Sequence, residues 1–203
     1  MAAIHTLYDS AISGNAYKVR LLAALLGLPL RRIEFDVTNG ATRTPEFLAK
    51  NPNGRVPLLE LPDGRLLAES NAILSYLAEG TEFAPAERFE RAQALQWMFF
   101  EQYSHEPYVA VARFWRHYLP MTPERLAQIE PKMKGGYAAL GVMETHLADR
   151  SYIVGERYSI ADIALYAYTH VAGEGGFELA PYPAVRAWLA RVAGRPGHIL
   201  ITD

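Results

Sequence analysis

The 203-residue sequence lacks cysteine altogether. Disulfide bonds, thiolate metal sites and cysteine nucleophiles are therefore excluded. Long apolar runs are missing as well, since none approaches the ~20 residues that span a bilayer. No charged-then-apolar signal opens the chain. We therefore expect a protein of the cytoplasm that makes no contact with a membrane.

An excess of charge of either sign is also absent. The chain carries 20 lysine and arginine residues against 22 aspartate and glutamate residues, a formal net charge of −2. Proteins that bind nucleic acids or anionic membranes usually show a basic excess or a basic face. With 50% hydrophobic and 21% charged residues, the composition is that of a folded globular protein. The expected partner is a small molecule or a second copy of the chain.

The first 80 residues alternate between strand-like and helix-like segments. Strands are predicted at 4–8, 31–37, 56–61 and 66–68, and helices at 17–28, 44–48 and 69–79. Thr44 is suited to cap the second helix, with Pro45 at its first position, and Ser70 is suited to cap the third. The order β-α-β-α-β-β-α predicts a small mixed sheet covered by helices.

The rest of the chain has only helical patterns. Helices are predicted at 85–118, 123–150, 159–171 and 183–192. Pro107 should break or kink the first of them, while Ser159 and Asp162 form a variant of the capping box at the start of the third. With 80–85 as a linker, the sequence predicts an α/β domain over residues 1–80 and an all-helical domain over residues 86–203.

Four local patterns occur in a fixed order along the chain. They are Ser13-Gly14-Asn15-Ala16-Tyr17-Lys18-Val19-Arg20-Leu21-Leu22, Asn51-Pro52-Asn53-Gly54-Arg55-Val56-Pro57-Leu58-Leu59, Glu69-Ser70-Asn71-Ala72-Ile73-Leu74-Ser75-Tyr76-Leu77 and Ser159-Ile160-Ala161-Asp162-Ile163. Together with the order of elements, they resemble the cytosolic glutathione transferase superfamily, and particularly its bacterial and serine-type branches. The resemblance implies a thioredoxin-like N-terminal domain, followed by a C-terminal helical glutathione transferase domain.

The resemblance assigns a glutathione site to the first domain. Val56-Pro57 matches the family's cis-proline strand, in which the residue before proline offers its backbone to the peptide. Glu69 and Ser70 open a helix whose first N–H groups would bind a glutathione carboxylate, with Glu69 accepting the ammonium group. Taken alone, the same pair would only cap a helix. Arg55 lies where relatives often place a basic residue near the glycyl end.

Two other basic residues compete with Arg55 for that role, namely Arg43 and Lys50. A solvated surface charge is the commoner fate of any such residue.

Activation of the thiol has three candidate donors. Ser13 and Asn15 precede the first helix, where a donor and the helix dipole would favour a thiolate. Either residue alone would more often be an N-cap. The resemblance places Ser13 at the catalytic serine of serine-type relatives, whereas Tyr8 matches a noncatalytic aromatic better than a catalytic tyrosine. The predicted order of importance is Ser13, then Asn15, then Tyr8.

Several aromatic residues lie close in sequence to the predicted break at Pro107. Aromatics at helical spacing are usually core residues, but the resemblance implies that this stretch contributes to the electrophile pocket, with Tyr108, Arg113 and Trp115 as candidates. His105 and His117 have no third partner at a suitable spacing, so no metal site is predicted.

The resemblance implies conjugation of glutathione to a small hydrophobic electrophile, the chemistry of detoxification. Glutathione would be a cosubstrate, and no metal or organic cofactor is implied. The alternatives are a glutathione-dependent disulfide reductase or peroxidase and a non-catalytic binding module on the same fold. A homodimer is expected, because Phe89, Trp97, Met98 and Phe100 give one helix more apolar surface than a single face needs.

Overall fold

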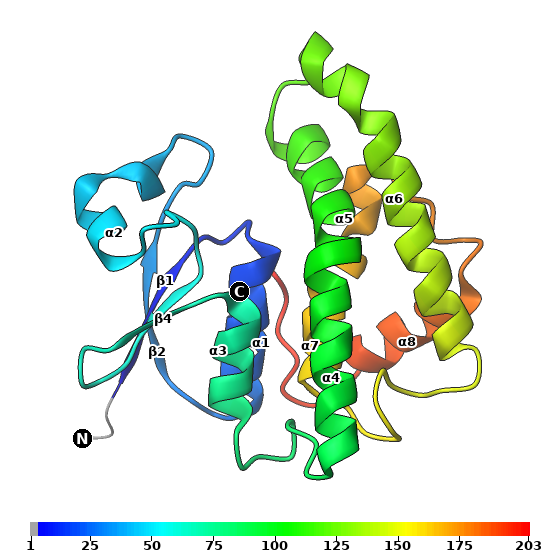
Figure 1. Ribbon diagram of the computed structural model, residues 1–203, viewed down its shortest axis with the longest axis horizontal. Coiled ribbons are helices and arrows are strands. Elements are labelled where there is room, and N and C mark those ends of the chain that lie inside the picture. Colours follow the sequence, from blue (N-terminus) through cyan, green and yellow to red (C-terminus); the bar gives the residue numbers. More distant parts are fainter. Residues whose placement is uncertain (1–3) are drawn as a thin grey trace. The chain divides into compact units, whose positions relative to one another are not determined.

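The computed structural model describes residues 4–203 and divides into two compact units (Figure 1). One unit contains the chain up to Glu79 together with Pro196–Asp203, and the other is Gly80–Arg195. The sequence predicted Pro196–Asp203 to belong to the helical domain. Instead, the backbone carbonyls of Ile199, Ile201 and Asp203 accept hydrogen bonds from side chains of the first unit, which is why this segment groups there.

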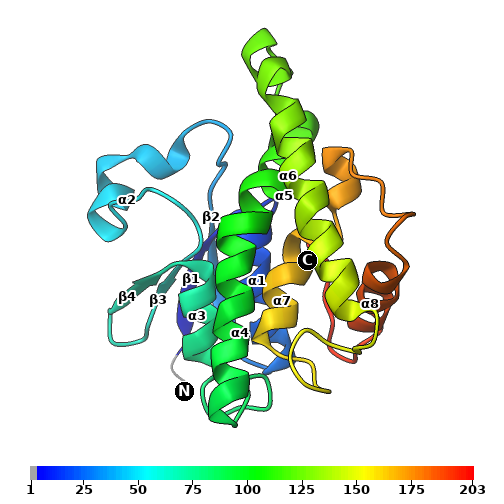
Figure 2. The same cartoon turned by 45° about the vertical axis from the view of Figure 1, so that its right-hand side comes forward.

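The first unit has the predicted order of elements. They are β1 (His5–Asp9), α1 (Gly14–Leu25), β2 (Leu30–Glu34), the 3-10 turn η1 (Ala41–Arg43), α2 (Pro45–Lys50), β3 (Leu58–Glu60), β4 (Leu66–Ala68) and α3 (Ser70–Ala78). The sheet order is β2-β1-β3-β4, with β1 parallel to β2, and β3 antiparallel to both β1 and β4. Helices α1 and α3 cover one face of this mixed sheet and α2 lies over the other (Figures 1 and 2).

Alternation along β1 sends its side chains into two separate clusters. Leu7 packs with Val19, Leu59 and Ile73 beneath α1 and α3. Tyr8 packs with Phe47 on the face covered by α2. Because β3 is antiparallel to both β1 and β4, the strands β1 and β4 run in the same direction. The helices that follow them, α1 and α3, therefore begin at the same edge of the sheet.

The starts of α2 and α3 show how far local sequence predicts a helix cap. Thr44 caps α2 as predicted, with its Oγ1 accepting from the Phe47 N–H at 3.3 Å and Pro45 in the first turn. The N-cap of α3 is Glu69, so the prediction of Ser70 as the cap is wrong by one residue. The Glu69 carbonyl accepts the first hydrogen bond of the helix, from the Ile73 N–H at 2.9 Å. Glu69 has a backbone φ of 70°, the only positive φ of a non-glycine residue within 4–203.

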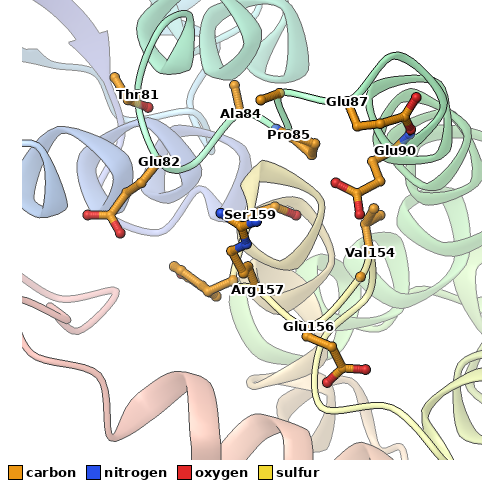
Figure 3. Close-up of a pocket in the computed structure, with 13 residues that line it drawn as sticks. Thr81, Glu82, Ala84, Pro85, Glu87, Glu90, Val154, Glu156, Arg157 and Ser159 are labelled. Atoms are coloured by element: carbon orange, nitrogen blue, oxygen red, sulfur yellow. The ribbon is translucent and has the colours of Figure 1, made fainter.

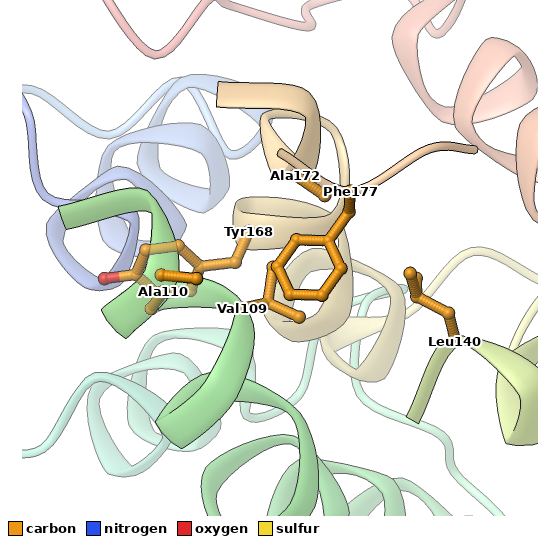
Figure 4. Close-up of a cluster of buried hydrophobic side chains, with 7 residues drawn as sticks. Val109, Ala110, Leu140, Tyr168, Ala172 and Phe177 are labelled. Atoms are coloured by element: carbon orange, nitrogen blue, oxygen red, sulfur yellow. The ribbon is translucent and has the colours of Figure 1, made fainter. Parts of the chain in front are cut away.

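The regular elements of the second unit, residues 80–195, are all helical. Its elements are α4 (Arg88–Phe100), η2 (Glu101–His105), α5 (Glu106–Arg113), η3 (Phe114–Tyr118), α6 (Pro123–Leu147), α7 (Ile160–Thr169), η4 (Ala172–Gly175) and α8 (Pro183–Ala193). All ten residues of α7 are buried, so this helix forms the centre of the unit. A cluster that includes Val109, Leu140, Tyr168 and Phe177 joins α5, α6, α7 and the segment after η4 (Figure 4).

Regular α-helix is interrupted just before Pro107, as the sequence predicted. The segment η2 is a π-helical turn, in which the Glu106 N–H donates to the Glu101 carbonyl five residues earlier. Proline has no N–H to donate, and its ring clashes with the carbonyl four residues back. The wider π turn accommodates Pro107 while the chain remains helical.

The predicted capping box at the start of α7 is present. The Asp162 carboxylate accepts from the N–H of Ser159 at 2.9 Å, and Ser159 is the N-cap. Asp162 also accepts from the Ile153 N–H and from the indole N–H of Trp188, each at 2.9 Å. Burial raises the pKa of Asp162 to about 6, against the opposing effect of these donors. This motif serves folding, because all its bonds join elements of the helical unit.

Candidate functional site

The start of α1 presents the first two predicted site residues. Ser13 is the N-cap, and its Oγ accepts from the Ala16 N–H at 3.2 Å. Its role as a cap, one of the two interpretations of the sequence, is therefore observed. Accepting that bond leaves the hydroxyl proton of Ser13 able to donate to another group. Asn15 lies in the first turn, half-buried, and turns its carboxamide towards α3.

Contacts between the starts of α1 and α3 bring Asn15 and Ser70 together. The Ser70 hydroxyl donates to Asn15 Oδ1 at 3.2 Å. Lys18, one turn after Asn15, donates from Nζ to Ser70 Oγ at 3.3 Å and to Asn71 Oδ1 at 3.4 Å. Ser70 is 4% exposed and Lys18 is fully buried. Sequence reasoning missed Lys18, although its place three residues after Asn15 put both residues on one face of the helix.

The edge of the sheet at which α1 and α3 begin is suited to bind an anion. The N-terminus of a helix carries partial positive charge and N–H groups without helical partners. Two such termini lie here, and the N-cap side chain of α3 makes no hydrogen bond to that helix. The Glu69 side chain is exposed beside them and supplies a carboxylate for a cationic group. The edge can therefore receive a molecule that carries both a carboxylate and an ammonium.

The Val56–Pro57 peptide bond is cis, as the sequence predicted. The loop before it is held by Asn51, whose Nδ2 donates to the Arg55 carbonyl at 2.8 Å. Gly54 is required in this loop, because its φ is 60° and a Cβ there would lie 3.0 Å from the Thr42 carbonyl oxygen. Val56 is half-buried, whereas the Arg55 side chain is exposed.

The hydroxyl of Tyr8, the third candidate for thiol activation, is hydrogen-bonded within the domain. It donates to Glu60 Oε2 at 2.6 Å, and Lys50 Nζ contacts the same oxygen at 3.1 Å. The bonds from Tyr8 and Lys50 lower the pKa of Glu60.

The two basic residues that compete with Arg55 are Lys50, which contacts Glu60, and Arg43. Arg43 donates from Nη1 to the Asn53 carbonyl at 2.9 Å. Both rivals of Arg55 therefore already have partners within the domain.

The three predicted pocket residues separate into two places in the helical unit. Lys132 Nζ lies near both the Tyr108 and the Trp115 rings, 5.5 Å and 6.0 Å from their centroids. Arg113 is 3% exposed and donates from Nε to Glu174 Oε2 at 2.6 Å, tying α5 to η4. The structure therefore groups Tyr108 with Trp115 but not with Arg113.

A separate hollow of about 320 Å³ lies in the helical unit between the 81–90 and 154–159 segments (Figure 3). Four carboxylates line it, from Glu82, Glu87, Glu90 and Glu156. It contains none of the predicted site residues.

Two further findings apply to residues 4–203. No group of three or more histidine, aspartate or glutamate side chains there is placed to hold a metal ion. None of the helices in the same range is both long and apolar enough to cross a membrane.

Both units of the chain match known proteins. Residues 12–79 match the model of the glutathione S-transferase N-terminal domain, and residues 94–196 match that of the C-terminal domain. A glutathione S-transferase from Pseudomonas fluorescens has 54% identity and a TM-score of 0.96, with 98% of this chain and 99% of that chain covered.

Two other relatives are named a disulfide-bond oxidoreductase and a glutathione transferase. The Disulfide-bond oxidoreductase YfcG of Escherichia coli is 34% identical, with 90% of this chain and 87% of the relative covered. A glutathione transferase from Burkholderia graminis, solved with two glutathione molecules bound per subunit, has 28% identity and a TM-score of 0.83, with 96% and 85% covered. Both domain matches, in the order that the fold requires, show that this chain belongs to the glutathione S-transferase family.

Proposed function

We propose that this protein is a glutathione transferase, in which the thiolate of bound glutathione attacks a small hydrophobic electrophile. The observation that carries the proposal is the hydrogen bond between Ser70 and Asn15, 3.2 Å long. It joins the predicted carboxylate-binding residue to a predicted thiol-activating residue. We place the reaction in the cytoplasm, where glutathione keeps thiols reduced, and in the detoxification of electrophiles.

The carboxylate end of glutathione is assigned to the start of α3. Its N–H groups and the Ser70 hydroxyl would donate to the γ-glutamyl carboxylate, and Glu69 would accept the ammonium. The backbone of Val56, before the cis-proline, would pair with the cysteinyl residue. Arg55 would meet the glycyl carboxylate, which its exposure allows.

The thiol end is assigned to the start of α1. The Ser13 hydroxyl and the helix dipole would stabilise the thiolate, with Asn15 as the second donor. Lowering a thiol pKa by two units requires about 2.7 kcal/mol, which one charge-assisted hydrogen bond and a helix terminus can supply. The sulfur lone pair then forms the carbon–sulfur bond as the electrophile's leaving group departs, and the thiol proton passes to solvent. Tyr108 and Trp115 would form the apolar wall for the electrophile.

The test compares Ser13→Ala and Asn15→Ala with Tyr8→Phe as the matched control. Ser13→Ala should lower kcat/KM by about 10- to 1000-fold, the loss expected when one donor to a developing anion is removed. Tyr8→Phe should leave turnover nearly unchanged, because its hydroxyl is bonded to Glu60. A silent Ser13→Ala with a large effect of Asn15→Ala would transfer the principal role to Asn15. Three silent variants would overturn the assignment of thiol activation.

Glutathione binding itself is tested by thermal unfolding. A ligand that binds only the folded state adds about 2.7 kcal/mol to stability at a hundred times its Kd. Ser70→Ala should weaken the response, because the carboxylate loses a donor. If millimolar glutathione leaves the melting temperature unchanged, the proposal fails and a non-catalytic module becomes the better interpretation.

A second candidate function, reduction of disulfides, is favoured by the similarity to a relative named a disulfide-bond oxidoreductase. The chain has no cysteine, so the exchange would run between glutathione molecules. One thiolate attacks the substrate disulfide and expels a thiolate, and a second glutathione then resolves the mixed disulfide. Two reduced glutathiones thereby give one oxidised glutathione and two thiols. Parallel assays with an electrophile panel and a small disulfide would separate the two activities.

A homodimer is also proposed, with its interface on α4. Of the four apolar residues named from the sequence, Trp97 and Met98 are 7% and 2% exposed and belong to the core, whereas Phe89 is 68% exposed. Leu95 and Phe99 of α4 and Tyr103 of the following η2 turn are 45%, 70% and 85% exposed. Their spacing of four residues suits one helical face, which a second chain would cover. Light scattering should give twice 22.7 kDa.

The Phe99→Glu variant should dissociate this dimer, because it would bury an unpaired charge in the interface. The matched control is Leu126→Glu, on another helix at a residue that is 56% exposed. Dimers that persist in Phe99→Glu would contradict this interface.

A further inference from the structure

Lys18 is a fully buried cation in the middle of the candidate site. Lysine is rarely buried completely unless bonds satisfy its ammonium group. Its Nζ reaches across from α1 to two polar groups in the first turn of α3, Ser70 Oγ at 3.3 Å and Asn71 Oδ1 at 3.4 Å. The side chain therefore connects the helix that carries Ser13 and Asn15 to the helix assigned to the ligand carboxylate.

The direction of these hydrogen bonds follows from the chemistry of the groups. A lysine ammonium can only donate, and an amide oxygen can only accept. Ser70 Oγ accepts from Lys18, so the single hydroxyl proton of Ser70 is directed to Asn15 Oδ1, 3.2 Å away. The chain of bonds therefore runs in one direction, from Lys18 to Ser70 to Asn15.

We propose that Lys18 is a positioning residue of the glutathione site, which fixes the proton of the Ser70 hydroxyl and thereby couples the carboxylate end of the site to Asn15. This inference rests on the function proposed above. A ligand carboxylate at the start of α3 is a stronger acceptor than an amide oxygen. The ligand carboxylate therefore accepts the hydrogen bond of the Ser70 hydroxyl, while Lys18 stays bonded to Ser70 Oγ. The Ser70–Asn15 hydrogen bond is then broken, so occupation of the carboxylate end changes the bonding of the amide beside the thiol.

The experiment measures the glutathione Kd and the pH at which the bound thiol ionises, read from thiolate absorbance. Lys18→Met keeps the length of the side chain without its donors, Lys18→Arg keeps a buried cation, and Lys134→Met, at an exposed lysine of α6, is the matched control. Lys18→Met should weaken glutathione binding about 3- to 10-fold and raise the ionisation pH by about half a unit, the effect of one hydrogen bond. Lys18→Arg should recover part of both effects, and Lys134→Met should change neither.

The same substitutions in a Ser70→Ala background separate coupling from packing. If Lys18 acts through the Ser70 hydroxyl, Lys18→Met should shift the thiol ionisation no further once that hydroxyl is gone. Equal shifts in both backgrounds would overturn the inference while leaving the proposed function intact. If the natural chain fails to bind glutathione, the proposed function fails first and the inference fails with it.

A measurement on the unmutated protein covers the case in which Lys18→Met does not fold. The side-chain amide resonances of Asn15 should shift when glutathione is added. They should shift far less with cysteinylglycine, which has the thiol but lacks the γ-glutamyl carboxylate. Equal shifts with both thiols would overturn the coupling.

Discussion

Replacement of Asp162 by alanine should be among the most damaging single changes in the helical unit. The carboxylate is fully buried and accepts hydrogen bonds from four donors. One oxygen serves the N–H groups of Ile153 and the Trp188 indole, and the other serves the N–H and hydroxyl of Ser159. Alanine would leave two backbone N–H groups and one indole N–H without their acceptor, at residues that are 0–3% exposed.

The cost can be worked from these donors. An unsatisfied buried donor costs about 1–3 kcal/mol, so three of them amount to about 3–9 kcal/mol. Natural domains are stable by only about 5–15 kcal/mol. Asp162→Ala should therefore unfold at a much lower urea concentration or fail to fold. Asp162→Asn keeps one acceptor oxygen and should be intermediate, because its NH₂ group cannot accept from Ser159.

The pH dependence of stability provides an independent check on Asp162. Burial raises its pKa to about 6 in the folded chain, against an ordinary value of 3.8. Between these values the folded state keeps the proton that the unfolded state has lost. The contribution of this group to stability is therefore greatest below pH 4 and falls as the pH rises through 6, by about 3 kcal/mol in all.

Urea unfolding of the natural chain and of Asp162→Asn between pH 4 and 8 would measure this effect. The stability of the natural chain relative to the variant should fall as the pH rises to 6, while other carboxyl groups cancel in the difference. Asp149→Asn, at an exposed carboxyl, should show no such change. A pH-independent difference at Asp162 would refute the reasoning about its ionisation. A cost below about 1 kcal/mol for Asp162→Ala would refute the reasoning about its donors.

Two further predictions concern packing. Gly136→Ala should destabilise the helical unit by about 1–3 kcal/mol, because its new Cβ would lie 2.4 Å from a buried phenylalanine ring. Gly141→Ala on the same helix meets nothing within 4 Å and should stabilise the unit by about 0.5–1 kcal/mol. Equal stabilities of the two variants in urea would contradict this. Deleting Ile199–Asp203 removes a backbone acceptor, 2.7 Å away, of the Arg20 side chain and should lower the urea midpoint of the first unit, with an unchanged midpoint as the contrary result.

Sequence predicted the elements and motifs whose causes are local. The start of α2 depends on Thr44 and Pro45, and the start of α7 depends on Ser159 and Asp162, so a few neighbouring residues were enough. Local sequence was less reliable where tertiary contacts compete. Ser70 looked like a cap, but the chain leaves β4 through Glu69, which takes that position.

Periodicity identified an apolar helix over 85–118 without showing which of its apolar residues face the core. Trp97 and Met98 are buried while Phe99 is 70% exposed, although all three are apolar neighbours in sequence. Burial depends on which helices pack against α4, chiefly α7. The order of residues in α4 does not contain that information.

The sequence by itself determined the family and the order of elements, because short motifs specify turns, caps and a proline strand. It also supplied most of the candidate site residues, which stay predictions. Only the tertiary structure decided which of those residues meet. Ser70 donates to Asn15, 55 residues earlier in the chain, and Lys18 reaches the same hydroxyl. That contact exists because β3 pairs antiparallel with both β1 and β4, so α1 and α3 begin at one edge of the sheet. Strand pairing over such separations depends on how side chains from distant segments pack in the core, which no short motif specifies.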